Sequence, residues 1–167
     1  MSPTVQVDVL VASNVTDVPD MVVIRQWLEQ AITHVGASGT LEVSVKVVDE
    51  DEGRSLNRQY RDKDYATNVL SFPLLDAAKA SMPAGPPTAL GDIVICGPIV
   101  AREAREQGLH SPDHWAHMLV HGALHLLGYD HVTDAQAAEM ESLEVLILAD
   151  GGVRNPYAPA AAERVQH

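Results

Sequence analysis

Cysteine is almost absent from this sequence, which has 167 residues and Cys96 as its only thiol. A single cysteine cannot form an intramolecular disulfide, so a secreted domain stapled by disulfides is excluded and a reducing cytoplasm is expected. Aromatic residues make up 4% of the chain, which argues against a platform of stacked rings for single-stranded nucleic acid. Apolar runs fall far short of the roughly 18 residues that span a bilayer, and the N-terminus lacks a signal-peptide pattern. We therefore expect a soluble protein with no membrane partner.

Positive charge is also in short supply. Lysine and arginine total 11 against 23 aspartates and glutamates, and the formal net charge at pH 7 is −12. This balance excludes a protein that coats nucleic acid through a broad basic surface, although it leaves a focused basic site open. Apolar residues account for 46% of the chain and charged residues for 20%, so the chain can form a packed core and is not disordered as a whole.

Hydrophobic periodicity predicts a small domain of strands and helices. Valines alternate with mainly polar residues at 4–11 and 41–47, which indicates two strands, and a helical pattern at 19–36 separates them. Such a connection permits parallel pairing of the two strands. The remaining elements are predicted as a short helix after the acidic residues 49–52, a strand at 68–72, a buried central strand at 91–96, and helices at 98–107, 112–127 and 134–150.

These elements predict an α+β fold in which helices pack on a small mixed sheet of about four strands. Ser111 is the expected N-cap of the helix that follows it, and Thr133 with Gln136 has the form of a capping box. We expect a single domain over residues 1–157 and a frayed, Ala-rich tail at 158–167. The segment 74–90 is rich in proline and is interpreted as a mobile surface loop.

Histidines cluster on and just after the predicted helix 112–127. His121 and His125 are four residues apart, so both rings project from one face of the helix, and Gly128 allows the chain to turn back and present His131. This is the ligand spacing of metzincin peptidases, and three imidazoles with an open fourth position are typical of catalytic zinc. The general base of those peptidases is missing, because Gly122 occupies its position. The pattern predicts a one-zinc site on a helix-turn without the peptidase base.

Other residues around this motif carry weaker signals. The three histidines could instead be core or surface residues that cluster without an ion, an alternative that the spacing disfavours. His117, one turn before the motif, could be a ligand, a residue that orients a ligand, or a buried ring, and we favour a role other than ligand. His114 is expected to be exposed. Cys96 is interpreted as a small apolar residue at a strand end rather than a fourth ligand.

Basic residues gather in the predicted short helix and just after it. Arg54, Arg58, Arg61 and Lys63 lie within ten residues and could form one basic ridge. Alternatively, Arg54 and Arg58 could offset the acidic residues at the start of the helix. Arg61 is the better functional candidate, because it lies where the helix runs into a polar loop and its guanidinium can bind a phosphate with two hydrogen bonds.

Four motifs resemble the YbeY endoribonucleases, the bacterial rRNA maturation factors. They are LNRQYRDKD at 56–64, TNVLSFP at 67–73, LGDI at 90–93 and HMLVHGALHLLGYDH at 117–131. The resemblance implies an α+β fold, a zinc ion on the three histidines of the motif, and cleavage directed at single-stranded RNA. It also implies work on the 3′ end of small-subunit rRNA and in ribosome quality control. Small ribosomal subunit proteins and an Era-like GTPase are the partners it implies.

The resemblance also suggests site residues. It implies Arg61 as the functional arginine beside the metal. The basic ridge itself makes Arg58 and Lys63 candidates for substrate binding. His117 and Asn68 are candidates for residues that contact the metal ligands without binding the metal. The family usually has Pro-Thr-Asp where this chain has Ala-Thr-Asn at 66–68, so the carboxylate expected there is replaced by an amide.

The sequence thus supports one leading hypothesis and two alternatives. The leading one is a cytoplasmic, metal-dependent endoribonuclease for single-stranded or ribosomal RNA. The alternatives are a zinc-dependent, peptidase-like hydrolase and a non-catalytic ribosome-assembly factor that uses zinc only to hold its fold. Asp64, Asp92 and Asp130 are candidates for a general base, and none is assigned.

Overall fold

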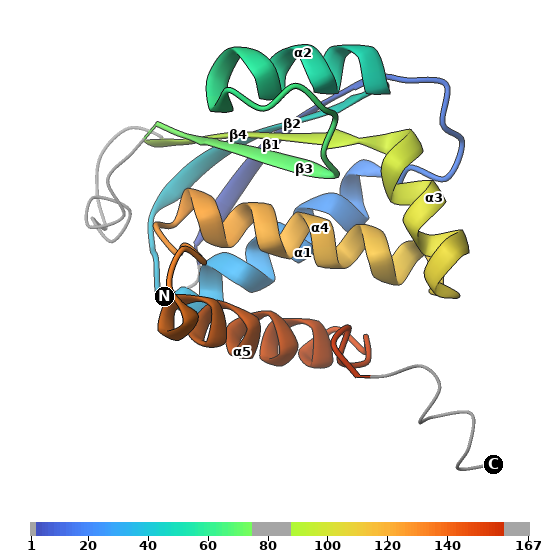
Figure 1. Ribbon diagram of the computed structural model, residues 1–167. Coiled ribbons are helices and arrows are strands. Elements are labelled where there is room, and N and C mark those ends of the chain that lie inside the picture. Colours follow the sequence, from blue (N-terminus) through green and yellow to red (C-terminus); the bar gives the residue numbers. More distant parts are fainter. Residues whose placement is uncertain (1–2, 75–87, 159–167) are drawn as a thin grey trace, which may run out of the picture.

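A four-stranded mixed sheet organises the molecule (Figure 1). The computed structural model describes residues 3–74 and 88–158. The strands lie in the order β1 (Thr4–Ala12), β2 (Thr40–Val48), β4 (Thr88–Cys96) and β3 (Val69–Pro73), of which the first three are parallel and β3 is antiparallel to β4. The helices are α1 (Met21–Val35), α2 (Glu50–Arg61), α3 (Gly97–Gln107), α4 (Ser111–Leu126) and α5 (Asp134–Asp150). The predicted α+β class and the mixed sheet of four strands are confirmed.

The helices cover the two faces of the sheet unequally. Figure 1 shows α2 on one side of the sheet and α1 and α4 on the other, with α5 outside them. The larger core cluster lies on the α1, α4 and α5 side and includes Leu28, Ile93 and Leu119. A smaller cluster around Leu70 and Cys96 lies under α2. Among the described residues, no helix is long and apolar enough to cross a membrane.

Strand β4 is internal in the sheet, as its continuous apolar run predicts. It begins at Thr88, however, so the prediction of a loop over 74–90 is wrong for residues 88–90, which form the start of the strand. Residues 75–87 of the predicted loop lie outside the described residues. Pairing with β2 shifts by one residue between Glu42 and Val43, so that Leu90 has no partner in β2 and Gly91 pairs with Val43. Gly91 has φ 144°, and a Cβ there would lie 2.3 Å from the carbonyl oxygen of Phe72. Glycine tolerates the positive φ and the close backbone contact at this irregularity, so the strand can continue through a segment whose sequence predicts a loop.

The helix ends follow the expected cap chemistry in part. The Thr133 and Gln136 capping box of α5 is confirmed, with both of its hydrogen bonds present. The predicted N-cap of α4 is wrong, because His110 is the cap residue and Ser111 lies inside the helix. The Ser111 hydroxyl donates to Asp17 Oδ2 at 2.6 Å, so a tertiary hydrogen bond replaces the local one. Residues 159–167 of the predicted frayed tail lie outside the described residues.

Candidate metal centre and cleft

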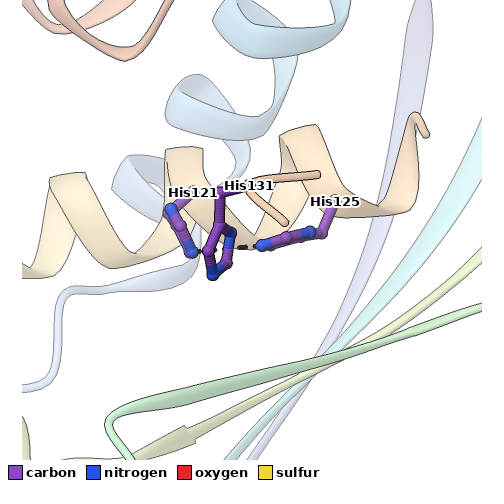
Figure 2. Close-up of side chains that lie close together, drawn as sticks. All are labelled: His121, His125 and His131. Carbon is purple, nitrogen blue, oxygen red and sulfur yellow. Dashed lines mark hydrogen bonds between the residues drawn. The ribbon is translucent and has the colours of Figure 1, made fainter. Parts of the chain in front are cut away.

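Three histidine rings converge at the C-terminal end of α4 (Figure 2). His121 and His125 project from one face of α4, and Gly128, with φ 101°, turns the chain so that His131 faces them. One nitrogen from each ring lies within 4.8 Å of the nitrogens of the other two. The structure therefore brings together the three ligands that the spacing predicts, and it does so through the glycine turn after the helix.

The hydrogen bonds of two of these rings and the lowered pKa of His125 suit a divalent cation. The Nε2 atoms of His121 and His125 lie 3.2 Å apart. His121 directs its Nδ1 to a Glu144 carboxylate oxygen at 2.6 Å, and the His125 ring has a hydrogen bond with the Tyr129 backbone. Burial, then the neighbouring His121 and His131, lower the pKa of His125 to about 4, so its ring is neutral at pH 7. Imidazole nitrogens that converge on one point match the preference of zinc.

A buried glutamate supports the cluster from α5. Glu144 has no exposed surface, and its Oε1 lies 2.9 Å from His117 Nε2 and accepts a hydrogen bond from the Tyr157 hydroxyl. Burial raises the pKa of Glu144, but hydrogen bonds from His117 and His121 outweigh burial and bring it to about 2. Burial and then the Glu144 hydrogen bond raise the pKa of Tyr157. Sequence reasoning missed Glu144 and Tyr157, although an acid on the apolar face of a helix is a usable signal.

The histidine cluster opens into a cleft of about 550 Å³ between α4 and the end of α2. Arg61 and Lys63 line this cleft together with the three histidines. Within the described part of the chain, neither cation has an acidic side chain within 4 Å. Asn57 is buried and donates to the Tyr65 carbonyl oxygen at 2.7 Å, which holds the loop after α2 against the helix. Two cations and three imidazoles thus line one cleft.

Arg58 is placed differently from Arg61. The Arg58 guanidinium lies 3.9 Å from Asp64, and Arg54 donates to the same carboxylate at 2.9 Å. Both arginines therefore pair mainly with an acid beyond the end of α2, and Asp51 at the start of the helix adds a weaker attraction to Arg54. Arg58 is not among the residues that line the cleft, and Asp64 is committed to these arginines.

Asn68 lines the cleft, but its amide is held from α3. Asn68 Nδ2 donates to both Glu103 carboxylate oxygens, at 3.2 and 3.3 Å, and Glu103 Oε1 also lies 2.9 Å from His114 Nε2. The expectation that His114 is exposed is wrong, since the residue is 6% exposed. The first turn of α4 packs beside α3, so this ring meets Glu103 instead of solvent. Of the other acidic candidates, Asp130 lines the cleft and Asp92 lies at a different groove.

The position of the missing peptidase base is closely packed. A Cβ at Gly122 would lie 2.9 Å from Ile93 Cγ2 of β4, and Ser71 Oγ donates to the Gly122 carbonyl oxygen at 3.1 Å. A glutamate at this position would have its first side-chain carbon against the sheet. The close approach of α4 to β3 and β4 therefore accounts for the glycine and disfavours a peptidase-type base there.

Comparison with known proteins identifies a matching family. The family described as Endoribonuclease YbeY matches residues 12–152. The chain belongs to the YbeY family. A YbeY endoribonuclease of Halorhodospira halophila is 54% identical over 139 residues, which cover 83% of this chain and 88% of the relative. One from Alcanivorax borkumensis is 46% identical over 167 residues, covering 96% of this chain and 91% of the relative.

A solved structure extends the comparison to the fold. The solution structure of TM1509 from Thermotoga maritima has a TM-score of 0.54 and 23% identity, and the match covers 92% of this chain and 99% of that one. At this identity the likeness concerns the fold. The YbeY resemblance seen in the four sequence motifs is confirmed by the family match and by the relatives named endoribonuclease.

Proposed function

We propose that this chain is a zinc-dependent endoribonuclease that hydrolyses phosphodiester bonds in single-stranded RNA. The observation that carries the proposal is the cleft in which three convergent imidazoles face Arg61 and Lys63. Membership of a family described as endoribonucleases supports the same reaction class. Three imidazole ligands with room for a further ligand fit a catalytic zinc better than a structural one, which is normally closed by four protein ligands.

Each group in the cleft has a role in this proposal. His121, His125 and His131 would hold the ion. Bound zinc supplies Lewis acidity toward a phosphoryl oxygen. Arg61 binds the scissile phosphate through its planar guanidinium and stabilises the negative charge that develops in the transition state. Lys63, on the loop that follows, attracts the flanking RNA backbone as a point charge. Arg58 contributes at most to the positive electrostatic potential at the edge of the cleft, because Asp64 partly neutralises its charge.

We infer that the physiological substrate is ribosomal RNA, at the 3′ end of the small-subunit rRNA, and that the enzyme serves ribosome quality control in the cytoplasm. The motif resemblance supports this inference, as does the net charge of −12, which disfavours capture of free RNA. Small ribosomal subunit proteins and an Era-like GTPase are the proposed partners that would deliver the substrate.

The two alternatives predict different outcomes. A zinc peptidase needs a base that the packed Gly122 position cannot supply. A non-catalytic assembly factor would keep its fold and zinc and cleave no RNA. It would leave unexplained why Arg61 and Lys63 line the cleft without acidic partners within the described residues.

The test measures metal content by mass spectrometry and cleavage of a single-stranded RNA on the same preparations. We expect His125→Ala to lose both zinc and cleavage. Arg61→Ala should keep zinc and its fold but cleave about 100- to 1,000-fold more slowly, the usual loss when a charge-stabilising donor is removed. Arg25→Ala is the matched control, an exposed arginine of α1 paired with Glu29. RNA cleavage that survives complete removal of metal, or an Arg61→Ala protein as active as the parent, would overturn the proposal.

A further inference from the structure

Glu144 is a buried charged residue, and both of its carboxylate oxygens have hydrogen-bond partners. Its side chain is 1% exposed. Oε2 lies 2.6 Å from His121 Nδ1, and Oε1 is shared by His117 Nε2, at 2.9 Å, and the Tyr157 hydroxyl. A buried carboxylate is costly to maintain unless such partners compensate it. The chain therefore maintains a fully hydrogen-bonded carboxylate directly behind one of the candidate metal ligands.

The direction of these hydrogen bonds determines which nitrogen of His121 is free. An ionised carboxylate only accepts hydrogen bonds, so His121 must donate from Nδ1. A neutral ring with its proton on Nδ1 has its lone pair on Nε2. That Nε2 atom lies 3.2 Å from His125 Nε2, on the side where the three rings converge. Glu144 thus selects the tautomer in which His121 can act as a ligand.

A second group of contacts keeps Glu144 in place. Tyr157 lies beyond the end of α5, thirteen residues after Glu144, and its ring packs edge-on against His117 with centroids 5.4 Å apart. The hydroxyl of Tyr157 also lies 3.2 Å from His117 Nε2. These two side chains hold Oε1, so the carboxylate cannot rotate its other oxygen away from His121 without breaking their hydrogen bonds.

We propose that Glu144 is a positioning residue of the metal centre, which holds His121 with its proton on Nδ1 and its Nε2 directed at the ion, and that Tyr157 and His117 hold Glu144 in that orientation. The segment after α5 thereby contributes to metal affinity without contacting the metal. This inference rests on the proposed metal site, and the experiment separates the two.

Two variants and one matched control test the inference. Glu144→Gln keeps the shape of the side chain but replaces one acceptor oxygen by a donor, and we expect its zinc dissociation constant to rise about 10- to 100-fold. Tyr157→Phe removes one hydroxyl from a partly exposed ring, and we expect a rise of roughly three- to tenfold. Glu139→Gln makes the same charge change at an exposed site of α5 and should bind zinc as the parent does.

The readouts are independent of catalysis. Competition with a chromophoric chelator measures zinc affinity well below the unfolding temperature, and long-range ¹H–¹⁵N spectra of the metal-free protein report the tautomer of His121. We expect an Nδ1-protonated ring in the parent and a loss of that preference in Glu144→Gln. If Glu144→Gln fails to fold, Tyr157→Phe carries the affinity test alone.

Two results would overturn the inference and leave the metal site intact. One is an Nε2-protonated His121 in the metal-free parent. The other is zinc affinity within twofold of the parent in both variants. A parent that binds zinc no better than His125→Ala would instead refute the metal site itself.

Discussion

Asn68→Asp should place a second carboxylate beside that of Glu103, just before β3. In the parent, Asn68 Nδ2 donates to both oxygens of Glu103, at 3.2 and 3.3 Å. A hydrogen bond to a charged group contributes about 1.5–3 kcal/mol. Two like charges about 4 Å apart repel by about 4 kcal/mol at an effective dielectric constant of 20, and the 27% exposure of Glu103 and the nearby His114 reduce this. We expect a loss of about 2–3 kcal/mol in the free energy of unfolding at pH 8.

The pH dependence of this loss follows from the same contact. A neighbouring carboxylate raises the pKa of the introduced carboxyl in the folded state above its value in the unfolded chain. The folded variant then binds protons more readily than the unfolded one, so its stability relative to the parent improves as the pH falls and worsens as it rises. Urea unfolding of parent and variant at pH 5 and pH 8 measures both values.

A double variant identifies the responsible partner. Glu103→Gln in the Asn68→Asp background removes the repulsion, and we expect it to restore stability at pH 8 to within about 1 kcal/mol of the parent. Asn14→Asp, the same charge change at an exposed site before α1, should stay within about 0.5 kcal/mol. The reasoning is refuted if Asn68→Asp is as stable as the parent at pH 8, or if the double variant is no more stable than the single one.

Three further predictions concern packing, metal and RNA. Gly122→Ala should lower the free energy of unfolding by about 1–3 kcal/mol, because its Cβ would lie 2.9 Å from Ile93 Cγ2; equal or higher stability in urea would contradict the packing argument. Zinc at 100 times its dissociation constant should stabilise the parent by about 2.7 kcal/mol, seen as a higher melting temperature in calorimetry. His125→Ala should show no such shift, and an equal shift would place the ion elsewhere. Filter binding should give weak, strongly salt-dependent association with free RNA, and tight, length-independent binding in physiological salt would show that the net charge of −12 does not limit affinity.

Local patterns accounted for most of the fold. Alternating valines marked β1 and β2, and the capping box marked the start of α5, because these signals depend on neighbours in the sequence. The start of β4 was missed, since Thr88 follows a proline-rich stretch and Gly91 interrupts the strand pattern. Only pairing with β2 and β3 makes these residues a strand, and that pairing is a long-range property.

The candidate site likewise contains residues that local sequence patterns predict and residues that depend on long-range packing. The three candidate histidine ligands and Arg61 belong to short motifs, so their positions could be predicted. Glu144 and Tyr157 come from the last helix and the segment after it, and their contact with His121 depends on how α5 packs on α4. The burial of His114 likewise depends on Glu103 of a neighbouring helix. Such residues could be recognised beforehand only as polar groups at positions where burial is expected.

The two halves of the cleft rest on separate parts of the interior. The histidines belong to α4, which packs into the larger core cluster, whereas Arg61 ends α2, which covers the smaller cluster on the other side of the sheet (Figure 1). Substitutions that loosen the smaller cluster, at Cys96 for example, should therefore shift the arginine relative to the imidazoles while leaving zinc affinity near that of the parent. Under the proposed function, metal affinity and phosphate binding can then change separately, and substitutions in the smaller cluster could weaken cleavage gradually without loss of the ion.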